Sequence, residues 1–203
     1  MPPRSRKSSA NSESGNSFSL PNSNFSLPPP ALVPKLRFPE FREAEAWHQG
    51  RIADIAVSES SSRALNKLSL KSKGYPVYGA DSCVGFIDSF DQADDYIAIV
   101  KDGSGVGRLT LKRGKSSILG TLAYIKCKPS SETKLTWLYY CLHSLDLRQF
   151  IKGSGIPHIY FSDYASHEVL IPSPSEQQKI AECLSSVWAC LEKMDTESGG
   201  FDV

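Results

Sequence analysis

The acidic residues that could support metal-dependent phosphodiester cleavage are few and poorly spaced. Two-metal hydrolysis needs clustered carboxylates with a nearby lysine, and the candidates here are Asp94, Asp95, Glu132 and Lys134. The last two fall in a polar linker before an apolar helical pattern, and not on a buried strand. The sequence therefore predicts that the chain has no nuclease centre of its own.

A second candidate for chemistry is the pentapeptide GSGVG, from Gly103 to Gly107. Glycine-rich loops cradle phosphates when they follow a strand, open a helix and end in Lys-Ser or Lys-Thr. Here the next residues are Arg-Leu-Thr-Leu, which favour a strand. We predict a tight passage between strands, with glycines needed for positive φ or for close approach to another backbone, and we expect no bound cofactor.

Histidine and cysteine are also unfavourably arranged for a metal or nucleophile site. The four histidines have no ligand spacing with one another or with cysteine, and the five cysteines form an odd set without a Cys-x-x-Cys pair. A zinc site and a disulfide framework are therefore not expected, and reduced thiols fit a cytoplasmic protein. No run of 18 apolar residues predicts a membrane span, and no apolar segment typical of an export signal follows the N-terminal charges.

Charge is nearly balanced overall, at a formal +1, but it is unevenly distributed. Residues 101–128 hold seven basic residues against one acidic residue, whereas residues 176–203 hold two basic against six acidic. Phosphate neutralisation supplies most of the sequence-independent affinity for nucleic acid. The first segment is therefore a candidate phosphate-binding surface, or else a solvated sheet face, and the second is a candidate protein-binding helix.

The elements that position these residues follow from hydrophobic period and turn signals. Residues 75–87, 95–100, 108–111 and 117–126 are rich in strand formers and are separated by glycine turns. Residues 52–58 predict an early strand or a helix-to-strand transition. Four leucines between residues 135 and 145 recur at helical spacing, and we expect Gly153 to end that helix. The pattern predicts an α+β fold with a sheet-rich centre and a projecting helix.

The segment from Ser154 to Trp188 is the most informative part of the chain. It reads as a polar glycine-rich loop, a short strand, a proline break and a long helix. Ser175 is the expected N-cap, with Gln178 in the capping-box position. Apolar residues then recur at alternating steps of four and three residues, which is the spacing of a coiled-coil seam that needs a partner helix. The predicted partner-helix residues are Ile180, Leu184, Val187, Trp188, Leu191 and Met194.

Four stretches of the chain together carry a resemblance to a known family. They are PKLRFPEF at residues 34–41, YPVYGADSCVGFID at 75–88, IAIVKDGSGVGRLTLKRGKSSILGT at 97–121, and GSGIPHIYFSDYASHEVLIPSPSEQQKIAECLS at 153–185. In this order they are similar to the DNA-specificity (S) subunits of type I restriction-modification systems. In that family the S subunit reads the DNA sequence, while partner subunits methylate and cut. An S subunit normally has two recognition domains separated by long antiparallel helices, so the resemblance implies half of such a subunit.

Composition and resemblance together predict three parts. Residues 1–30 hold nine Ser and six Pro and cannot build a core, so they are expected to be a disordered leader. Residues 31–172 are the expected target recognition domain, and residues 173–198 the conserved coiled-coil helix. The resemblance implies a non-catalytic subunit that binds double-stranded DNA, docks methyltransferase (M) and restriction (R) subunits, and pairs with a second copy or another half-subunit.

Two surfaces are predicted to face DNA: the basic segment, and the loop that contains Ser154 and His158. An alternative for the loop is that Ile156, His158 and Tyr160 pack it against the long helix. The predicted DNA-facing residues are Lys73, Tyr78, Lys101, Arg108, Lys112, Arg113, Lys115, Ser154, His158 and Tyr160.

Other functions stay open at this point. One is a self-sufficient endonuclease with an embedded recognition domain, and another is a module that binds a protein through the acidic helix and never touches DNA. Within the resembled family, the sequence is also compatible with the N-terminal half of a longer chain.

Overall fold

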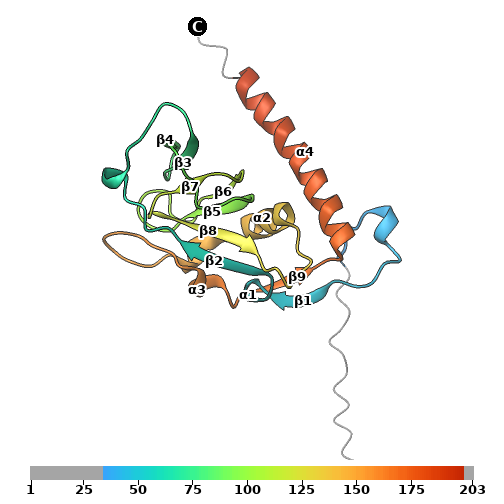
Figure 1. Ribbon diagram of the computed structural model, residues 1–203. Coiled ribbons are helices and arrows are strands. Elements are labelled where there is room, and N and C mark those ends of the chain that lie inside the picture. Colours follow the sequence, from blue (N-terminus) through green and yellow to red (C-terminus); the bar gives the residue numbers. More distant parts are fainter. Residues whose placement is uncertain (1–33, 199–203) are drawn as a thin grey trace, which may run out of the picture. The chain divides into compact units, whose positions relative to one another are not determined.

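The computed structural model describes the backbone of residues 34–198 and the side chains of residues 34–194 (Figure 1). All of these residues belong to one compact unit. The predicted leader, residues 1–30, lies outside the described residues. No helix in the described part of the chain is long and apolar enough to cross a bilayer.

The centre of the fold is a four-stranded antiparallel sheet with the order β2, β8, β5, β6. Its strands are Ala56–Ser60 (β2), Leu122–Cys127 (β8), Tyr96–Val100 (β5) and Leu109–Lys112 (β6). Every residue of β5 is buried, because both faces of the sheet are covered. Alternate residues of this strand enter two different hydrophobic clusters, as the two-residue period of a strand requires.

A smaller three-stranded sheet covers one face, through the cluster that contains Tyr96 and Tyr124. It has the order β4, β3, β7, with strands Cys83–Ile87 (β4), Tyr75–Tyr78 (β3) and Ser117–Ile118 (β7). Strand β3 pairs antiparallel with β4 and parallel with β7. The sheet-rich centre predicted from residues 75–126 is confirmed.

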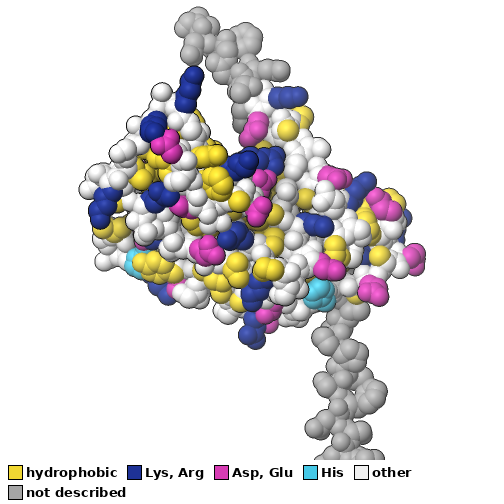
Figure 2. All heavy atoms as spheres, in the orientation of Figure 1, with side chains coloured by type: hydrophobic (Ala, Val, Ile, Leu, Met, Phe, Trp, Pro, Cys, Tyr) yellow, Lys and Arg dark blue, Asp and Glu magenta, His cyan; other side chains and the backbone are white. Residues whose placement is uncertain are grey.

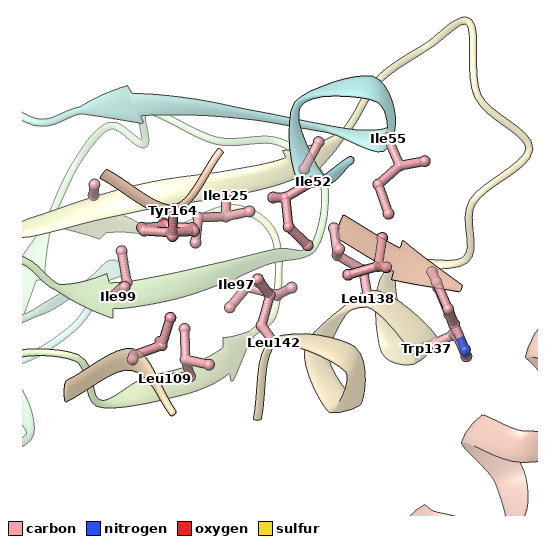
Figure 3. Packing of buried hydrophobic residues seen from close by; sticks show 14 of the residues in the cluster. Ile52, Ile55, Ile97, Ile99, Leu109, Ile125, Trp137, Leu138, Leu142 and Tyr164 are labelled. Atoms are coloured by element: carbon pink, nitrogen blue, oxygen red, sulfur yellow. The ribbon is translucent and has the colours of Figure 1, made fainter. Parts of the chain in front are cut away.

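The other face carries the larger cluster, to which helix α2, Leu135–Ser144, contributes Trp137, Leu138 and Leu142. Figure 3 shows Leu142 beside Ile97 of the sheet, with Leu138 and Trp137 farther along the same cluster. The leucine spacing that predicted the helix is confirmed.

The predicted end of this helix at Gly153 is wrong. Helix α2 ends nine residues earlier, at Ser144, and Leu145 after it is extended. The carboxylate of Asp146 accepts a hydrogen bond from the backbone N–H of Arg148 and so starts a separate 3-10 turn, Leu147–Phe150 (η3). The helix therefore ends where the side chain of Asp146 caps the next turn, and Gly153 is not involved.

Strands β1 (His48–Arg51) and β9 (Glu168–Ile171) form an antiparallel pair of their own. Short helices lie beside them, Ile52–Ile55 (α1) and Phe161–Tyr164 (α3), and single 3-10 turns occur at Pro39–Phe41 (η1) and Leu65–Lys67 (η2). Residues 52–58 are thus the helix-to-strand transition, one of the two predicted forms. The strand expected after the polar loop is β9.

Helix α4, Pro174–Ser198, follows the proline break and extends away from the sheets beyond α2 (Figure 1). The predicted N-cap at Ser175 is wrong. The Ser173 hydroxyl accepts the Glu176 N–H at 3.4 Å, and the Ser173 carbonyl accepts the Gln177 N–H. The helix therefore begins with Pro174 in its first turn, where the fixed φ of proline suits it and no N–H is needed.

Candidate nucleic-acid interface and partner helix

A lysine and an aromatic ring from two different sheets meet at the edge of the fold. Lys112, on β6, places its Nζ 4.1 Å from the ring centroid of Tyr78, on β3, which is cation–π distance. Partial burial lowers the pKa of Lys112 and raises the pKa of Tyr78. The structure thus brings together two sequence-predicted residues that lie 34 positions apart.

Several other basic residues of the segment are paired with acids, and most of these acids lie outside the counted residues 101–128. Arg108 donates to Asp81 at 2.9 Å, and Arg113 donates to Asp95 at 2.7 Å. Lys101 pairs with its neighbour Asp102. Figure 2 shows basic and acidic side chains interleaved across the visible face of the globule, without one continuous basic field.

Lys73 and Lys115 are different, since both are exposed and no hydrogen bond or ion pair of their ammonium groups occurs among the described residues. Lys115 has a positive φ of 54° and follows Gly114, whose absent Cβ would lie 2.0 Å from the carbonyl oxygen of Ala93. The turn therefore needs that glycine and directs a lysine outward with a left-handed backbone. These two lysines are available to phosphates without breaking an existing pair.

The loop before α3 is fastened to the segment that precedes the GSGVG turn. The N–H of Gly103 donates to the Pro157 carbonyl at 2.9 Å, and the N–H of Ile159 donates to the Lys101 carbonyl at 2.8 Å. The His158 and Tyr160 rings lie 5.2 Å apart, and Lys101 Nζ lies 5.8 Å from the Tyr160 ring centroid.

These contacts bear on the two interpretations of the loop. Ile156 is 72% exposed and Tyr160 is 47% exposed, and Ser154 is exposed as well. The hydrogen bonds of the loop are with residues 101–103 and Lys152, and none in the described part of the chain is with α4. The side chains of Ser154, Ile156 and Tyr160 therefore face solvent, whereas Ile159 is buried in the main hydrophobic cluster.

The GSGVG turn joins these two groups of residues. Gly103, Gly105 and Gly107 have φ of 84°, 79° and 86°, so the prediction that these glycines adopt positive φ is confirmed. Lys101, with Tyr160 and His158, lies before the turn, and Arg108, with Asp81, lies after it. A cluster of cationic, aromatic and hydrogen-bonding side chains thus surrounds one tight backbone passage, which suits contact with a phosphate backbone and base edges.

Asp81 is a site residue that sequence reasoning missed. It lies in the turn between β3 and β4, and its partner Arg108 is 27 residues away. The turn composition Gly-Ala-Asp-Ser marks an exposed polar loop, but nothing local to it signals the arginine. Residues that a sheet places together from separate hairpins cannot be paired from one sequence.

Of the carboxylates considered for metal chemistry, Asp95 is otherwise engaged. Asp95 accepts hydrogen bonds from Arg113 and from the backbone N–H of Gly114, which together lower the pKa of Asp95. Among the described residues there is no group of three or more His, Cys, Asp or Glu side chains that could hold a metal ion. The cysteines are free thiols, and burial raises the pKa of Cys127 and of Cys141 to about 11.

The seam of α4 divides into a buried beginning and an exposed remainder. Ile180 packs against the main hydrophobic cluster. Beyond it the apolar side chains are exposed: Leu184 by 40%, Val187 by 52%, Trp188 by 48%, Leu191 by 53% and Met194 by 60%. The first predicted partner-helix residue therefore belongs to the globule, and the others form an uncovered apolar stripe.

The base of α4 is fixed to the globule by polar contacts that the sequence did not reveal. Arg37 binds the Glu176 carboxylate with two nitrogens, at 2.8 and 2.6 Å, and both side chains are almost completely buried. Arg37 also donates to the carbonyls of Ala44 and Glu45. Further along, the Tyr140 hydroxyl of α2 donates to Ser185 at 3.0 Å. The direction of the exposed stripe is thus set by the recognition domain.

Comparison with solved structures finds the same fold in proteins of one kind. The S subunit of a type I restriction-modification system from M. genitalium matches with a TM-score of 0.64 and 22% identity, over 81% of this chain and 44% of that one. HsdS from Thermoanaerobacter tengcongensis matches with a TM-score of 0.57 and 16% identity, over 83% of this chain and 43% of that one. A structure from work on complex assembly and conformational transition of the type I R-M system also matches, with a TM-score of 0.57 and 18% identity, over 81% and 43%.

This chain therefore spans less than half the length of the solved structures that it matches. No curated protein matches it. The family described as "Type I restriction modification DNA specificity domain" matches residues 44–198, a range that includes both sheets, the GSGVG turn and helix α4. The predicted resemblance is confirmed, and the chain belongs to the type I restriction-modification DNA specificity family.

Proposed function

We propose that this chain is the DNA-recognition part of a type I restriction-modification complex and that it directs M and R subunits to a target motif. The observation that carries the proposal is the family match from residue 44 to residue 198, which includes both the surface around the GSGVG turn and the exposed stripe of α4. The first of these is suited to DNA and the second to a protein partner. Residues 31–172 are the proposed recognition domain, and residues 173–198 the proposed partner helix.

The proposed DNA surface comprises the residues around the turn together with the free lysines. Lys73 and Lys115 supply phosphate contacts, because their ammonium groups are exposed and unpaired among the described residues. Lys101, His158 and Tyr160 add cationic and ring surfaces beside the turn, and Lys112 with Tyr78 adds another at the far end of β6. This division of labour follows the general rule that phosphate contacts position a protein on the duplex while base contacts specify the sequence.

The proposed partner of α4 is a second copy of this chain or another half-subunit, arranged antiparallel. A stripe from Leu184 to Met194 that is 40 to 60% exposed is stabilised when another apolar stripe covers it. With two copies, two-fold symmetry requires the recognised site to be an inverted repeat, with a spacing set by the length of the paired helices. The acidic outer surface of α4 is available for the M subunits.

Methyl transfer and cleavage are assigned to the partner subunits. The purified chain, supplied with Mg²⁺, ATP and S-adenosylmethionine, is expected neither to methylate nor to cut DNA. Cleavage by the chain alone, lost in Asp95→Ala or Glu132→Ala, would instead support the endonuclease alternative.

The test is methylation mapping in cells that carry the cognate M subunits with and without this chain. We expect one defined adenine-methylated motif to disappear when the chain is removed and to return when it is supplied again. An unchanged set of modified motifs, together with binding of the chain to a protein but not to DNA, would overturn the proposal in favour of a protein-interaction module.

A further inference from the structure

Arg108 is fixed in the fold more firmly than its exposure suggests. Its N–H donates to the Gly105 carbonyl at 3.0 Å, and its carbonyl accepts the N–H of Val100 at 3.0 Å. The first bond closes the GSGVG turn and the second joins the residue to strand β5. Both the backbone N–H and the backbone carbonyl of Arg108 are therefore hydrogen-bonded.

The guanidinium itself is held between two loops. On one side Nη2 donates to Asp81 Oδ1 at 2.9 Å, from the turn between β3 and β4. On the other side it lies against Gly105, where an added Cβ would come within 2.1 Å of Nη2. The φ of 79° favours a glycine at residue 105, and the lack of a side chain there lets the guanidinium lie against the backbone.

Comparison with the other arginines shows what is particular about this arrangement. Arg37, Arg63 and Arg148 each bind a carboxylate through two nitrogens, so their forks are already occupied. Arg113 uses one nitrogen but its side chain is 87% exposed, whereas the Arg108 side chain is 43% exposed. Arg108 thus combines a restrained guanidinium with a fork that is mostly free.

The free donors define the chemistry that this residue can recognise. A guanidinium has five N–H donors, and among the described residues the recorded hydrogen bonds of the Arg108 side chain use one nitrogen. A planar fork with fixed orientation matches two acceptors in one plane. In the DNA major groove that pair is O6 and N7 of guanine, whereas adenine presents one acceptor and one donor there.

The carboxylate beside the fork argues against a simple phosphate contact. Asp81 is exposed, with a side-chain exposure of 84%, so a phosphate approaching Arg108 also approaches a negative charge. A base edge has no such charge, and the amino group of the cytosine paired with the guanine is a donor that a carboxylate accepts. An Arg–Asp pair therefore fits a G·C base pair better than it fits a phosphodiester.

We propose that Arg108 is a specificity-determining residue that reads a guanine in the major groove and that Asp81 is the positioning residue that orients it. This inference rests on the proposed function, because it names the base chemistry read by the same DNA surface. It assigns sequence readout to a residue next to the turn and leaves phosphate binding to the free lysines.

The experiment maps the methylated motif produced by the full chain with its cognate M subunits. Arg108→Lys keeps the charge but removes the fork. We expect one guanine position of the motif to become degenerate, with preference for guanine at that position reduced roughly 5- to 150-fold, as for loss of a bidentate base contact. The salt dependence of binding to unrelated DNA should stay unchanged, since the number of neutralised phosphates is the same.

Two further variants separate readout from structure. Asp81→Asn leaves Arg108 in place without its anionic partner and should relax the same motif position by a smaller factor. Arg148→Lys is the control, because Arg148 is also an exposed arginine that pairs with an aspartate and is not among the predicted DNA-facing residues, and it should leave the motif intact. Thermal denaturation of each variant establishes that the fold is retained.

The possible outcomes separate the assignment of Arg108 from the proposed function on which it rests. A motif that is unchanged in Arg108→Lys, or one that contains no G·C pair, would overturn the assignment of Arg108 and leave the proposed function standing. Equal relaxation in Arg148→Lys would likewise overturn it. A wild-type complex that neither binds nor methylates a defined motif would overturn the proposed function and this inference with it.

Discussion

The basic side chains between residues 101 and 115 differ chiefly in whether their charge is already engaged. Arg108, Arg113 and Lys101 each have an acidic partner, and Lys112 lies over the Tyr78 ring. Exposed ion pairs contribute little to stability, so these pairs matter more as orienting devices than as sources of folding energy. A phosphate must compete with the existing partner at each of these residues, but it meets no such competitor at Lys73 or Lys115.

The free lysines therefore carry the first prediction. Replacement of Lys73 and Lys115 together by Ala should weaken binding to all DNA sequences alike and reduce the slope of log affinity against log salt by about 0.9 per lost phosphate contact. Fluorescence anisotropy titrations at several salt concentrations, with the M subunits present, measure both quantities. Lys179→Ala is the matched control, since Lys179 lies on α4 and pairs with Glu40. Equal slopes for the wild type and the double variant would place these lysines away from DNA.

At the scale of elements, the junction between α2 and α4 depends on one buried amide. Gln177 is 2% exposed. Its Oε1 accepts the N–H of Lys134 at the start of α2, and its Nε2 donates to the Pro172 carbonyl. A single side chain thus satisfies the N-terminus of one helix and the loop that leads into the other.

Gln177→Ala should destabilise the fold by about 1 to 3 kcal/mol, because it leaves buried polar groups without partners. Gln178→Ala provides a nearly ideal control, since the exposed Gln178 bonds only to Glu182 within the same helix. Urea denaturation of the two variants compares their free energies of unfolding. Indistinguishable values would mean that water replaces the amide at no cost, contrary to its burial.

The exposed stripe of α4 carries a prediction about assembly. Leu184→Glu with Leu191→Glu should dissociate the proposed dimer, because each buried aliphatic side chain is worth roughly 1.5 to 3 kcal/mol and the introduced charges repel. Ser186→Glu with Ala189→Glu adds the same charge on roughly the opposite side of the helix and should leave the dimer intact. Sedimentation velocity measures the mass of each variant. A wild type that stays monomeric at high concentration, both alone and mixed with a second half-subunit, would contradict the assignment.

These elements also show which parts of the structure the sequence could predict. The central strands, β9, the positive-φ glycines and the apolar stripe rest on local patterns of burial, turn chemistry and spacing, and they were predicted. The end of α2 lies just before the Asp146 cap, and the start of α4 depends on Ser173 and Pro174. Neither boundary was predicted, because several nearby residues are equally plausible caps or stops. The Arg108–Asp81 and Arg37–Glu176 pairs join residues far apart in the chain, and no local pattern predicts such contacts.

At the scale of the whole described chain, we propose that readout and assembly are carried by different segments that meet at a defined boundary. The turn, the two larger sheets and the polar loop lie between residues 48 and 171. The segment before them is joined to α4, because Arg37 and Glu40 bind Glu176 and Lys179 of that helix. Residues 34–41 therefore act as part of the helix base, although they are far from it in sequence.

This boundary makes domain exchange the sharpest test of modularity. Replacement of residues 42–170 by the equivalent segment of another specificity subunit keeps Arg37 and Glu40 with α4 and moves β1 together with nearly all of β9. The residues of α2 that face α4, such as Tyr140, which bonds Ser185, should be retained in the graft to preserve the angle of the helix. We expect the hybrid, assembled with the same M subunits, to methylate the donor's half-site in place of the original one while its mass in sedimentation stays that of the wild type. The control exchanges residues 34–170, which separates Arg37 from Glu176 and should impair assembly while the donor's half-site is still the one that is read. A hybrid that assembles but still methylates the original motif would show that sequence readout lies outside residues 42–170.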